Sequence, residues 1–304
     1  MKKLRSPILY VGGKGRMVSK LLKFIPPHKI YVEVFGDGAS LLFAKEPSSV
    51  EIYNDIDSAV VNFYRVLRNP KKFKKFYHKV SLTPYSREEF NFCRETWKDC
   101  QDDVERAYRW FIMARFSFSG MLGRSWSMAV TATSGKMAQG TCAWINLIHL
   151  LPEIHARIMQ VQIEHYDFHK LIPIYDTTET FMYLDPPYVH DTRKIQNFYS
   201  YEMTDDDHKE LVELILKSKS MFMLSGYNHP IYQPLEVAGW RRVDFQTSCD
   251  CAGRTRNSKL KGRGSALKYA PRIESIWLSP NTQEAYDLLH FPKSEYEEEK
   301  NESA

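Results

Sequence analysis

The sequence predicts an α/β fold, with a mixed, mostly parallel sheet that carries helices on both faces. Short apolar strands occur in both halves of the chain, and several of them end in a turn that contains glycine, proline or aspartate. Between the two sets of strands lies a long segment with helical spacing of its apolar residues. The α/β unit is therefore expected to be split by a mostly helical insert.

The first part of the sheet is predicted near the N-terminus. Residues 30–34 are β-branched and aromatic, a glycine turn follows, and 39–45 begins a helix. A second strand is expected over 50–53, ending at an acidic stretch that contains Asp55. Strand, glycine turn and helix in this order open an α/β sheet.

The middle of the chain, from 58 to about 150, carries many Lys and Arg among apolar residues at helical spacing. Within it, the Ser-, Thr- and Gly-rich stretch 117–140 is expected to form a hairpin or loop. The predicted domains are a split α/β domain (1–57 and 151–292), the insert (58–150) and an acidic, disordered tail (293–304).

The α/β pattern then resumes, with strands expected over 161–165, 180–184 and 221–225. Thr204 precedes three aspartates, and lysines close the segment at 217 and 219. Acids in the first turn and bases in the last turn predict a capped helix over 204–219.

Composition bounds the class of protein only loosely. The 304 residues are 43% hydrophobic, which suffices for a sizeable core, and the net charge of +5 indicates a nucleic-acid partner weakly. The N-terminus begins like a signal peptide, but its apolar stretch is short, and no run reaches the roughly 18 residues of a membrane span. A cytoplasmic location without membrane contact is expected. Five cysteines without paired spacing predict reduced thiols and no metal site.

The most specific motif is Asp185-Pro186-Pro187-Tyr188, directly after the strand at 180–184. Two prolines make the chain leave the strand as a rigid extended loop. A carboxylate and free carbonyls at a strand's carboxyl end suit an exocyclic amine, and Tyr188 suits stacking on a base taken out of a duplex. The alternative is an ordinary turn, because Asp-Pro and Pro-Pro are common turn dipeptides.

A second block, Glu33 to Gly38, contains Phe35 and the glycines Gly36 and Gly38, which let a backbone approach a ligand closely. Leu41 replaces the third glycine of a dinucleotide fingerprint, which argues against a nicotinamide cofactor. Asp55 lies where a carboxylate accepts hydrogen bonds from ribose hydroxyls. The alternative is a structural turn. A third glycine-rich block, Tyr10 to Gly15, lacks the spacing of a phosphate-binding loop.

Together, YVGGK at 10–14, EVFGDG at 33–38 and DPPY at 185–188 resemble the Dam-type (D12 class) DNA adenine N6-methyltransferases in identity, order and spacing. The resemblance runs to about residue 280. It implies the Rossmann-like fold of S-adenosylmethionine-dependent methyltransferases, with 58–150 as a target-recognition insert. Aspartate at 185 resembles the adenine-N6 enzymes rather than the cytosine-N4 enzymes. Tyr10 stands where relatives usually have Trp.

The resemblance also assigns residues to roles. The cofactor S-adenosyl-L-methionine is expected to contact residues of three blocks and two further positions: Tyr10, Gly13, Lys14, Glu33, Phe35, Gly36, Gly38, Asp55, Asp167 and Phe168. The catalytic residues are expected to be Asp185, Pro186, Pro187 and Tyr188. Transfer would be in-line, without a covalent enzyme intermediate and without a metal.

Two segments are expected to hold double-stranded DNA. Arg115 and Arg124, in the part of the insert that matches the family's base-reading hairpin, are candidates to pair with guanine, and the alternative is two solvated arginines. The run 252–272 has seven Lys or Arg and no acid, and fits either a phosphate-binding or a disordered loop. Its candidate contacts are Arg254, Arg256, Lys259, Lys261 and Arg263.

The function expected is site-specific adenine-N6 methylation of DNA with base flipping. Two alternatives remain: methylation of RNA adenine, and a catalytically silent DNA-binding specificity partner. A cognate restriction endonuclease that acts separately is a further possible partner.

Overall fold

The computed structural model describes residues 4–9, 14–129, 131–192, 201–248 and 271–290. Several predicted positions lie outside these ranges: Tyr10, Gly13, Arg254, Arg256, Lys259, Lys261, Arg263 and the tail 293–304.

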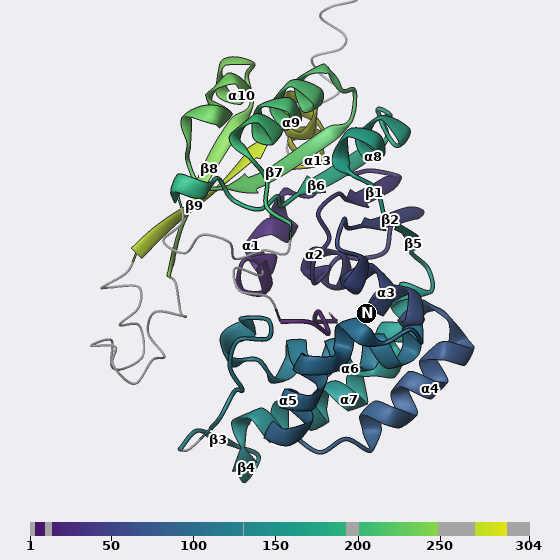
Figure 1. Ribbon diagram of the computed structural model, residues 1–304. Coiled ribbons are helices and arrows are strands. Elements are labelled where there is room, and N and C mark those ends of the chain that lie inside the picture. The colour runs from purple at the N-terminus through teal and green to yellow at the C-terminus, as the bar shows by residue number, and fades with distance from the viewer. Residues whose placement is uncertain (1–3, 10–13, 130, 193–200, 249–270, 291–304) are drawn as a thin grey trace, which may run out of the picture.

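A seven-stranded sheet forms the centre of the molecule, in the order β5-β2-β1-β6-β7-β9-β8 (Figure 1). Five neighbouring strands are parallel: β1 (Ile30–Glu33), β2 (Val50–Asn54), β5 (Gln162–Glu164), β6 (Thr180–Leu184) and β7 (Met221–Gly226). Two antiparallel strands complete one edge: β8 (Arg241–Ser248) and β9 (Pro271–Leu278). The mostly parallel sheet is confirmed, and β8 and β9 are additions to the predicted elements.

Helices cover both faces of the sheet, because alternate strand residues point to opposite faces and both faces are apolar. One face packs against α1 (Val18–Leu21), α2 (Ser40–Ala44) and α3 (Ser58–Arg68). The other face packs against α8 (Phe168–Ile174), α9 (Asp205–Lys217) and α10 (Gln233–Val237). The chain's last described helix is α13 (Pro280–His290), which contacts β7.

The segment between β2 and β5 is mostly helical, as expected. After α3 it forms α4 (Pro70–Ser81), α5 (Arg87–Thr96), α6 (Asp103–Phe116), α7 (Gln139–Ile158) and a small hairpin of β3 (Thr133–Ser134) and β4 (Met137–Ala138). Figure 1 shows these helices as a layer below the sheet. One hydrophobic cluster runs from the sheet into them, and α7 extends past residue 150. The division into domains remains a prediction.

Helix starts follow the capping residues that the sequence supplies. Thr204 and Asp207 form a reciprocal capping box at the start of α9, so the predicted helix over 204–219 is confirmed apart from its last two residues. Side chains also cap α3, α4, α5 and α6, through Asp57, Asn69, Ser86 and Asp102. In the described part of the chain, no helix is both long and apolar enough to cross a membrane.

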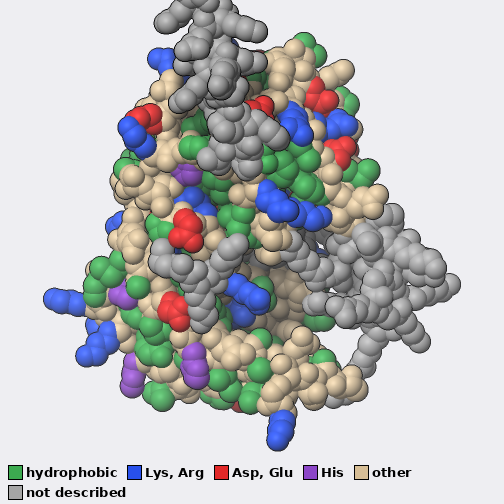
Figure 2. Space-filling model, turned by 180° about the vertical axis from the view of Figure 1, so that it is seen from behind, with side chains coloured by type: hydrophobic (Ala, Val, Ile, Leu, Met, Phe, Trp, Pro, Cys, Tyr) green, Lys and Arg blue, Asp and Glu red, His purple; other side chains and the backbone are tan. Residues whose placement is uncertain are grey.

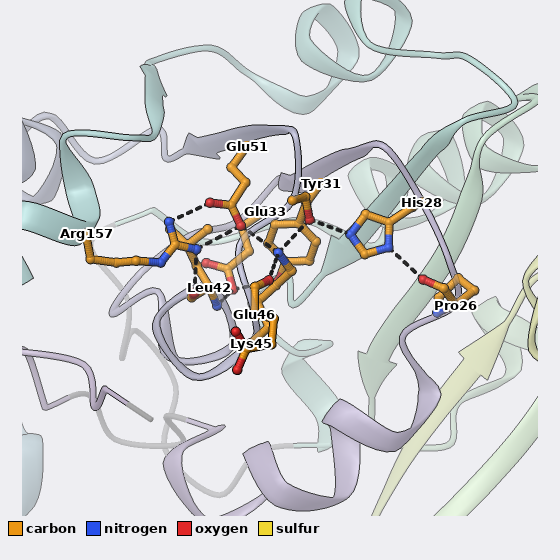
Figure 3. A network of polar contacts seen from close by, with 10 residues as sticks. Pro26, His28, Tyr31, Glu33, Leu42, Lys45, Glu46, Glu51 and Arg157 are labelled. Atoms are coloured by element: carbon orange, nitrogen blue, oxygen red, sulfur yellow. Dashed lines mark hydrogen bonds and ion pairs between the residues drawn. The ribbon is translucent and has the colours of Figure 1, made fainter. Parts of the chain in front are cut away.

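A buried ionic network ties β2 to helix α7 (Figure 3). Both oxygens of Glu51 are used: Lys45 Nζ and Arg157 Nη2 reach Oε1 at 2.5 and 2.8 Å, and Arg157 Nη1 lies 2.5 Å from Oε2. Arg157 also donates to the carbonyl of Leu42 at 3.1 Å. Burial alone would raise the pKa of Glu51, but the two cations hold it below its ordinary value. We call the ion pairs of Glu51 with Lys45 and Arg157 the β2–α7 network.

Candidate active site

A pocket opens at the carboxyl edge of the parallel strands, where the loops after β1, β2, β5 and β6 meet. From β1, the sheet continues to β2 and β5 on one side and to β6 and β7 on the other, so the strand order changes direction at β1. Open α/β sheets bind ligands at such a point. The loops contribute these lining residues: Phe35, Asp37, Asp55, Asp167, Phe168 and Asp185.

Asp185 follows β6 directly and projects into this pocket. Its Oδ1 lies 2.9 Å from the ammonium of Lys14. Lys14 is the first residue of a short 3-10 helix, Lys14–Arg16. The same ammonium contacts the hydroxyl of Tyr188 and a carboxylate oxygen of Glu274, which also accepts from the Tyr188 hydroxyl. We call these four side chains the Lys14 cluster. The structure thus brings the first and third sequence blocks together.

Burial and charge oppose each other in the Lys14 cluster. Burial raises the pKa of Asp185 to about 6, although Lys14 lowers it. Burial alone would lower the pKa of Lys14, but Asp185 and Glu274 raise it above its ordinary value. Lys14 is therefore a permanent cation, and Asp185 is ionised at neutral pH but protonated below about pH 6.

Asp55 lies at the end of β2 and shapes the neighbouring turn. Its Oδ2 accepts the backbone N–H of Asp37 and its Oδ1 that of Asp57, both at 2.7 Å. Burial raises the pKa of Asp55 to about 6, and the two N–H donors oppose the rise. Each carboxylate oxygen keeps a second lone pair, so Asp55 can still accept a hydrogen bond from a ligand in the pocket.

Asn54 was not among the predicted site residues, yet it joins two loops of the pocket to the end of β2. Its amide donates to the carbonyls of Val34 and Tyr166 at 2.8 and 3.0 Å, and its oxygen accepts the Tyr166 N–H at 2.8 Å. The side chain is buried, so its three hydrogen bonds hold the loops after β1 and β5 to β2.

The two glycines of the second block serve packing within the protein. A Cβ on Gly36 would lie 2.2 Å from the Tyr53 ring and 2.7 Å from the Asn54 carbonyl, and one on Gly38 would lie 2.8 Å from Ser6 Oγ. Close approach is therefore required, as the sequence indicated, but the neighbours found here are the adjacent strand and the N-terminal segment rather than open pocket.

Glu33, the first residue of that block, lies beneath the pocket rather than in its lining. Its Oε1 accepts from the Tyr31 hydroxyl at 3.0 Å and from the Leu42 N–H at 2.8 Å, while Oε2 has no hydrogen-bond partner in the described chain. Burial raises the pKa of Glu33 to about 8, so the carboxyl group is largely protonated at neutral pH.

Two aromatic rings line the side of the pocket that is nearest to β5. Phe35 and Phe168 have ring centroids 5.9 Å apart, and Ile56 is a further apolar residue of the pocket lining. Asp167 caps α8 by accepting the His169 N–H at 2.9 Å. This wall can hold a flat apolar ring with a carboxylate at its edge.

The helical segment reaches the pocket through the loop after α6. Arg124, Leu122 and Gly120 line it together with the residues after the strands. Arg115, at the end of α6, is placed differently: its Nε is buried without a hydrogen-bond partner among the described residues, and burial lowers its pKa to about 10. The structure thus separates the two predicted arginines, with Arg124 at the pocket and Arg115 partly inside the helical layer.

Glu274 is the member of the Lys14 cluster that sequence reasoning missed. It lies on β9, 260 residues from Lys14. The signal available in the sequence was a strand-like run at 271–278, in which Glu274 precedes an apolar stretch. Such a run predicts a strand, but it gives no indication that one of its carboxylates reaches a loop at the far end of the chain.

Comparison with known proteins finds both a matching family and individual relatives. The family model described as D12 class N6 adenine-specific DNA methyltransferase matches residues 10–233. The chain is 26% identical to the type II methyltransferase M1.LlaDCHI of Lactococcus lactis subsp. cremoris over 273 residues, covering 86% of this chain and 92% of the relative. It is 23% identical to the type II methyltransferase M.MjaIII of Methanocaldococcus jannaschii over 287 residues, covering 83% and 94%.

A third relative, the DNA N-6-adenine-methyltransferase of Escherichia phage P1, is 22% identical over 265 residues, covering 83% of this chain and 34% of that protein. The family match includes all three sequence blocks and the helices between them, and it confirms the resemblance on which the sequence prediction rested. The chain therefore belongs to the D12 class of N6 adenine-specific DNA methyltransferases.

Proposed function

We propose that this DNA adenine methyltransferase transfers a methyl group from S-adenosylmethionine to adenine N6 at a specific site in duplex DNA, with Asp185 as the residue that orients the amine. The observation that carries the proposal is one pocket shared by Asp185, Asp55 and the Phe35–Phe168 wall. A nucleoside cofactor and a target amine can therefore meet within it.

The pocket fits the proposed cofactor on three counts. The Phe35–Phe168 wall suits the adenine ring, and Asp167 lies at the edge of that wall. Asp55 retains lone pairs for the ribose hydroxyls. The acidic lining suits a ligand with a positive charge. When bound, S-adenosylmethionine supplies a methyl group on a sulfonium centre, which an amine nitrogen attacks directly.

The residues after β6 would orient the nucleophile. The Asp185 carboxylate and the Pro186 carbonyl accept the two hydrogens of the amine, which leaves the nitrogen lone pair directed at the methyl group. Pro187 lines the pocket and keeps the loop extended, while Lys14 keeps the Asp185 carboxylate ionised. Tyr188 supplies a ring on which a flipped base stacks.

The helical segment 58–150 would serve as the target-recognition insert. Its loop with Arg124 lies at the pocket, close to where a flipped base would enter. Arg115, with a buried Nε and no carboxylate partner among the described residues, gains stability from an anionic or acceptor group of DNA. Figure 2 shows basic and acidic side chains interspersed on one face of the molecule. We assign DNA contact to the two arginines of the insert and to the run 252–272, on the basis of their positive charge.

Two of the relatives are named type II methyltransferases, which act within restriction and modification. We extend this role to the present chain. A separately acting cognate endonuclease then becomes the expected partner, because methylation of its site protects the host DNA.

The substrate is tested by radiolabelled methyl transfer from S-adenosylmethionine in three reactions. One contains duplex DNA, one contains RNA of the same sequence, and one contains no nucleic acid. Label in DNA, recovered as N6-methyladenine at one recurring sequence, supports the proposal. Label in RNA alone, or specific DNA binding without transfer by a folded protein, contradicts it.

The two kinds of DNA recognition are tested by salt and sequence. Neutralising Arg254, Arg256 and Lys259 should flatten the slope of log affinity against log salt by about 0.9 for each phosphate that is no longer neutralised, without changing site preference. Arg124→Ala should leave the slope nearly unchanged and relax preference at one base pair by about 1–3 kcal/mol. If the triple variant of Arg254, Arg256 and Lys259 changes site preference while Arg124→Ala changes only the slope, the two roles are reversed.

A further inference from the structure

Strand β9 reaches the Asp185 loop from outside the segment that the family model matches. The Oε1 atom of Glu274 accepts from both the Lys14 ammonium and the Tyr188 hydroxyl, and its side chain is only 12% exposed. A second contact comes from Arg272, which donates to the Tyr227 hydroxyl at 3.0 Å. The Tyr227 ring packs edge-on against Tyr188, with 4.7 Å between centroids. Two residues of β9 thus support Tyr188.

We propose that Glu274 is a positioning residue for methyl transfer: it holds Lys14 and Tyr188 together, so that Asp185 keeps an acceptor oxygen for the target amine. This inference rests on the proposed role of Asp185. Glu274 itself acts through its two neighbours and needs no contact with the base or the cofactor.

The physical reason lies in how the donors are shared. Lys14 has three N–H donors, and it shares them among the carboxylates of Asp185 and Glu274 and the hydroxyl of Tyr188. Without Glu274, the buried ammonium would have Asp185 as its one carboxylate partner in the cluster, and would compete with the amine for that group. Tyr188 would also lose the acceptor of its phenol hydrogen, and with it a constraint on the ring.

The charge of Glu274 provides a signature beyond simple loss of rate. Burial is the main cause of the raised pKa of Asp185, Lys14 opposes it, and Glu274 adds to it. Removing the Glu274 charge should therefore lower the pKa of Asp185 and shift the acid limb of the pH–rate profile to lower pH. The charged and titratable groups that influence Asp185, or are influenced by it, are Lys14, Glu274, Tyr183, Tyr188, Tyr232, Glu33 and Asp37.

The test uses single-turnover methyl transfer by the full chain, with S-adenosylmethionine and duplex DNA that contains the unmethylated target site. Glu274→Ala should slow transfer by up to about 100-fold, the scale of misplacing a reacting group through a change that does not touch it. Glu274→Gln should be slowed less, because an amide oxygen still accepts from Tyr188, and its acid limb should move to lower pH. Asp244→Asn, which removes a more exposed carboxylate of β8 outside the Lys14 cluster, should behave as the wild type.

Two further variants separate the possible failures. Asp185→Asn that transfers at the normal rate overturns the proposed function itself. If Asp185→Asn is inactive while folded Glu274→Ala and Glu274→Gln keep the wild-type rate and pH profile, only the role of Glu274 is overturned. In a Tyr188→Phe background the loss from Glu274→Ala should shrink, because the two residues act as a unit. Full additivity of the two losses would contradict the proposed coupling.

Discussion

Two buried clusters in this molecule both contain carboxylates and cations, but they shift the pKa of a carboxyl group in opposite directions. In the β2–α7 network, two cations surround the single carboxylate of Glu51 and hold its pKa low. In the Lys14 cluster, one cation lies between two carboxylates, and burial raises the pKa of Asp185. In the first cluster, both cations pair with the one carboxylate of Glu51. The second keeps unused acceptor capacity and faces a pocket.

The difference indicates which buried charges hold the fold together and which are available to a ligand. Removing a member of the β2–α7 network leaves an uncompensated charge and affects stability. Removing a carboxylate of the Lys14 cluster should affect binding or chemistry, because burial already disfavours its ionised form. The following variants test this distinction, starting with the largest expected effect.

Glu51→Ala should reduce the free energy of unfolding by about 3–5 kcal/mol, because Lys45 and Arg157 would remain buried without their carboxylate. Chemical denaturation measures the change. A matched control is Glu179→Ala, which breaks an exposed ion pair with Lys29 and should cost less than about 1 kcal/mol. Equal losses of unfolding free energy in the two variants would show that the β2–α7 network stabilises the fold no more than an exposed ion pair does.

Asp185→Ala should slow methyl transfer more than about 100-fold, the scale of removing an essential polar interaction with the reacting group. Binding of S-adenosylmethionine and the melting temperature should stay close to those of the wild type, since Lys14 keeps Glu274 as a partner. Single-turnover kinetics and calorimetry on the same sample decide this. A folded variant with near-normal turnover would remove Asp185 from the chemistry.

Asp55→Ala should weaken S-adenosylmethionine binding by about 1–3 kcal/mol, the range for losing a hydrogen bond to a buried charged group. Isothermal calorimetry measures this directly. Part of any change in stability will come from the missing hydrogen bonds to the backbone of Asp37 and Asp57. Unchanged affinity would place the ribose carboxylate elsewhere, with Asp57, which also lines the pocket, as the next candidate.

Two buried glutamates, Glu33 beneath the pocket and Glu51 in the β2–α7 network, should respond to pH with opposite signs. The pKa of Glu33 is raised from 4.5 to about 8 in the folded protein, so its contribution to stability is present below 4.5 and is lost as pH rises through 8. The pKa of Glu51 is lowered, so its contribution is present above 4.5 and is lost as pH falls.

Glu33→Gln should therefore flatten the fall in melting temperature between about pH 5 and 8, because the amide carries no proton to lose. Thermal unfolding of the cofactor-free protein across this range tests the prediction. The control is the same series with Glu51→Gln, whose largest difference from the wild type should lie at neutral pH. A slope unchanged by Glu33→Gln would mean that Glu33 is ionised in the folded state.

The sequence by itself determined the elements whose signals are local. The strand over 180–184 is confirmed without any shift of its ends, and the Thr204 capping box begins α9 because cap and first turn lie within four residues. The placement of Asp185 at a strand end followed from the same local pattern. Hydrogen bonds and side-chain alternation over a few residues suffice for such features.

The tertiary structure alone decided what depends on contacts between distant segments. Glu274 meets Lys14 and Tyr188 because β9 pairs antiparallel with β7, which no local pattern encodes. Gly36 is required by the ring of Tyr53 on the neighbouring strand, and Asn54 joins loops that are far apart in the chain. Burial, which sets the pKa values of Asp185 and Glu33, likewise arises only when the sheet and helices pack together, because it depends on every element around a group.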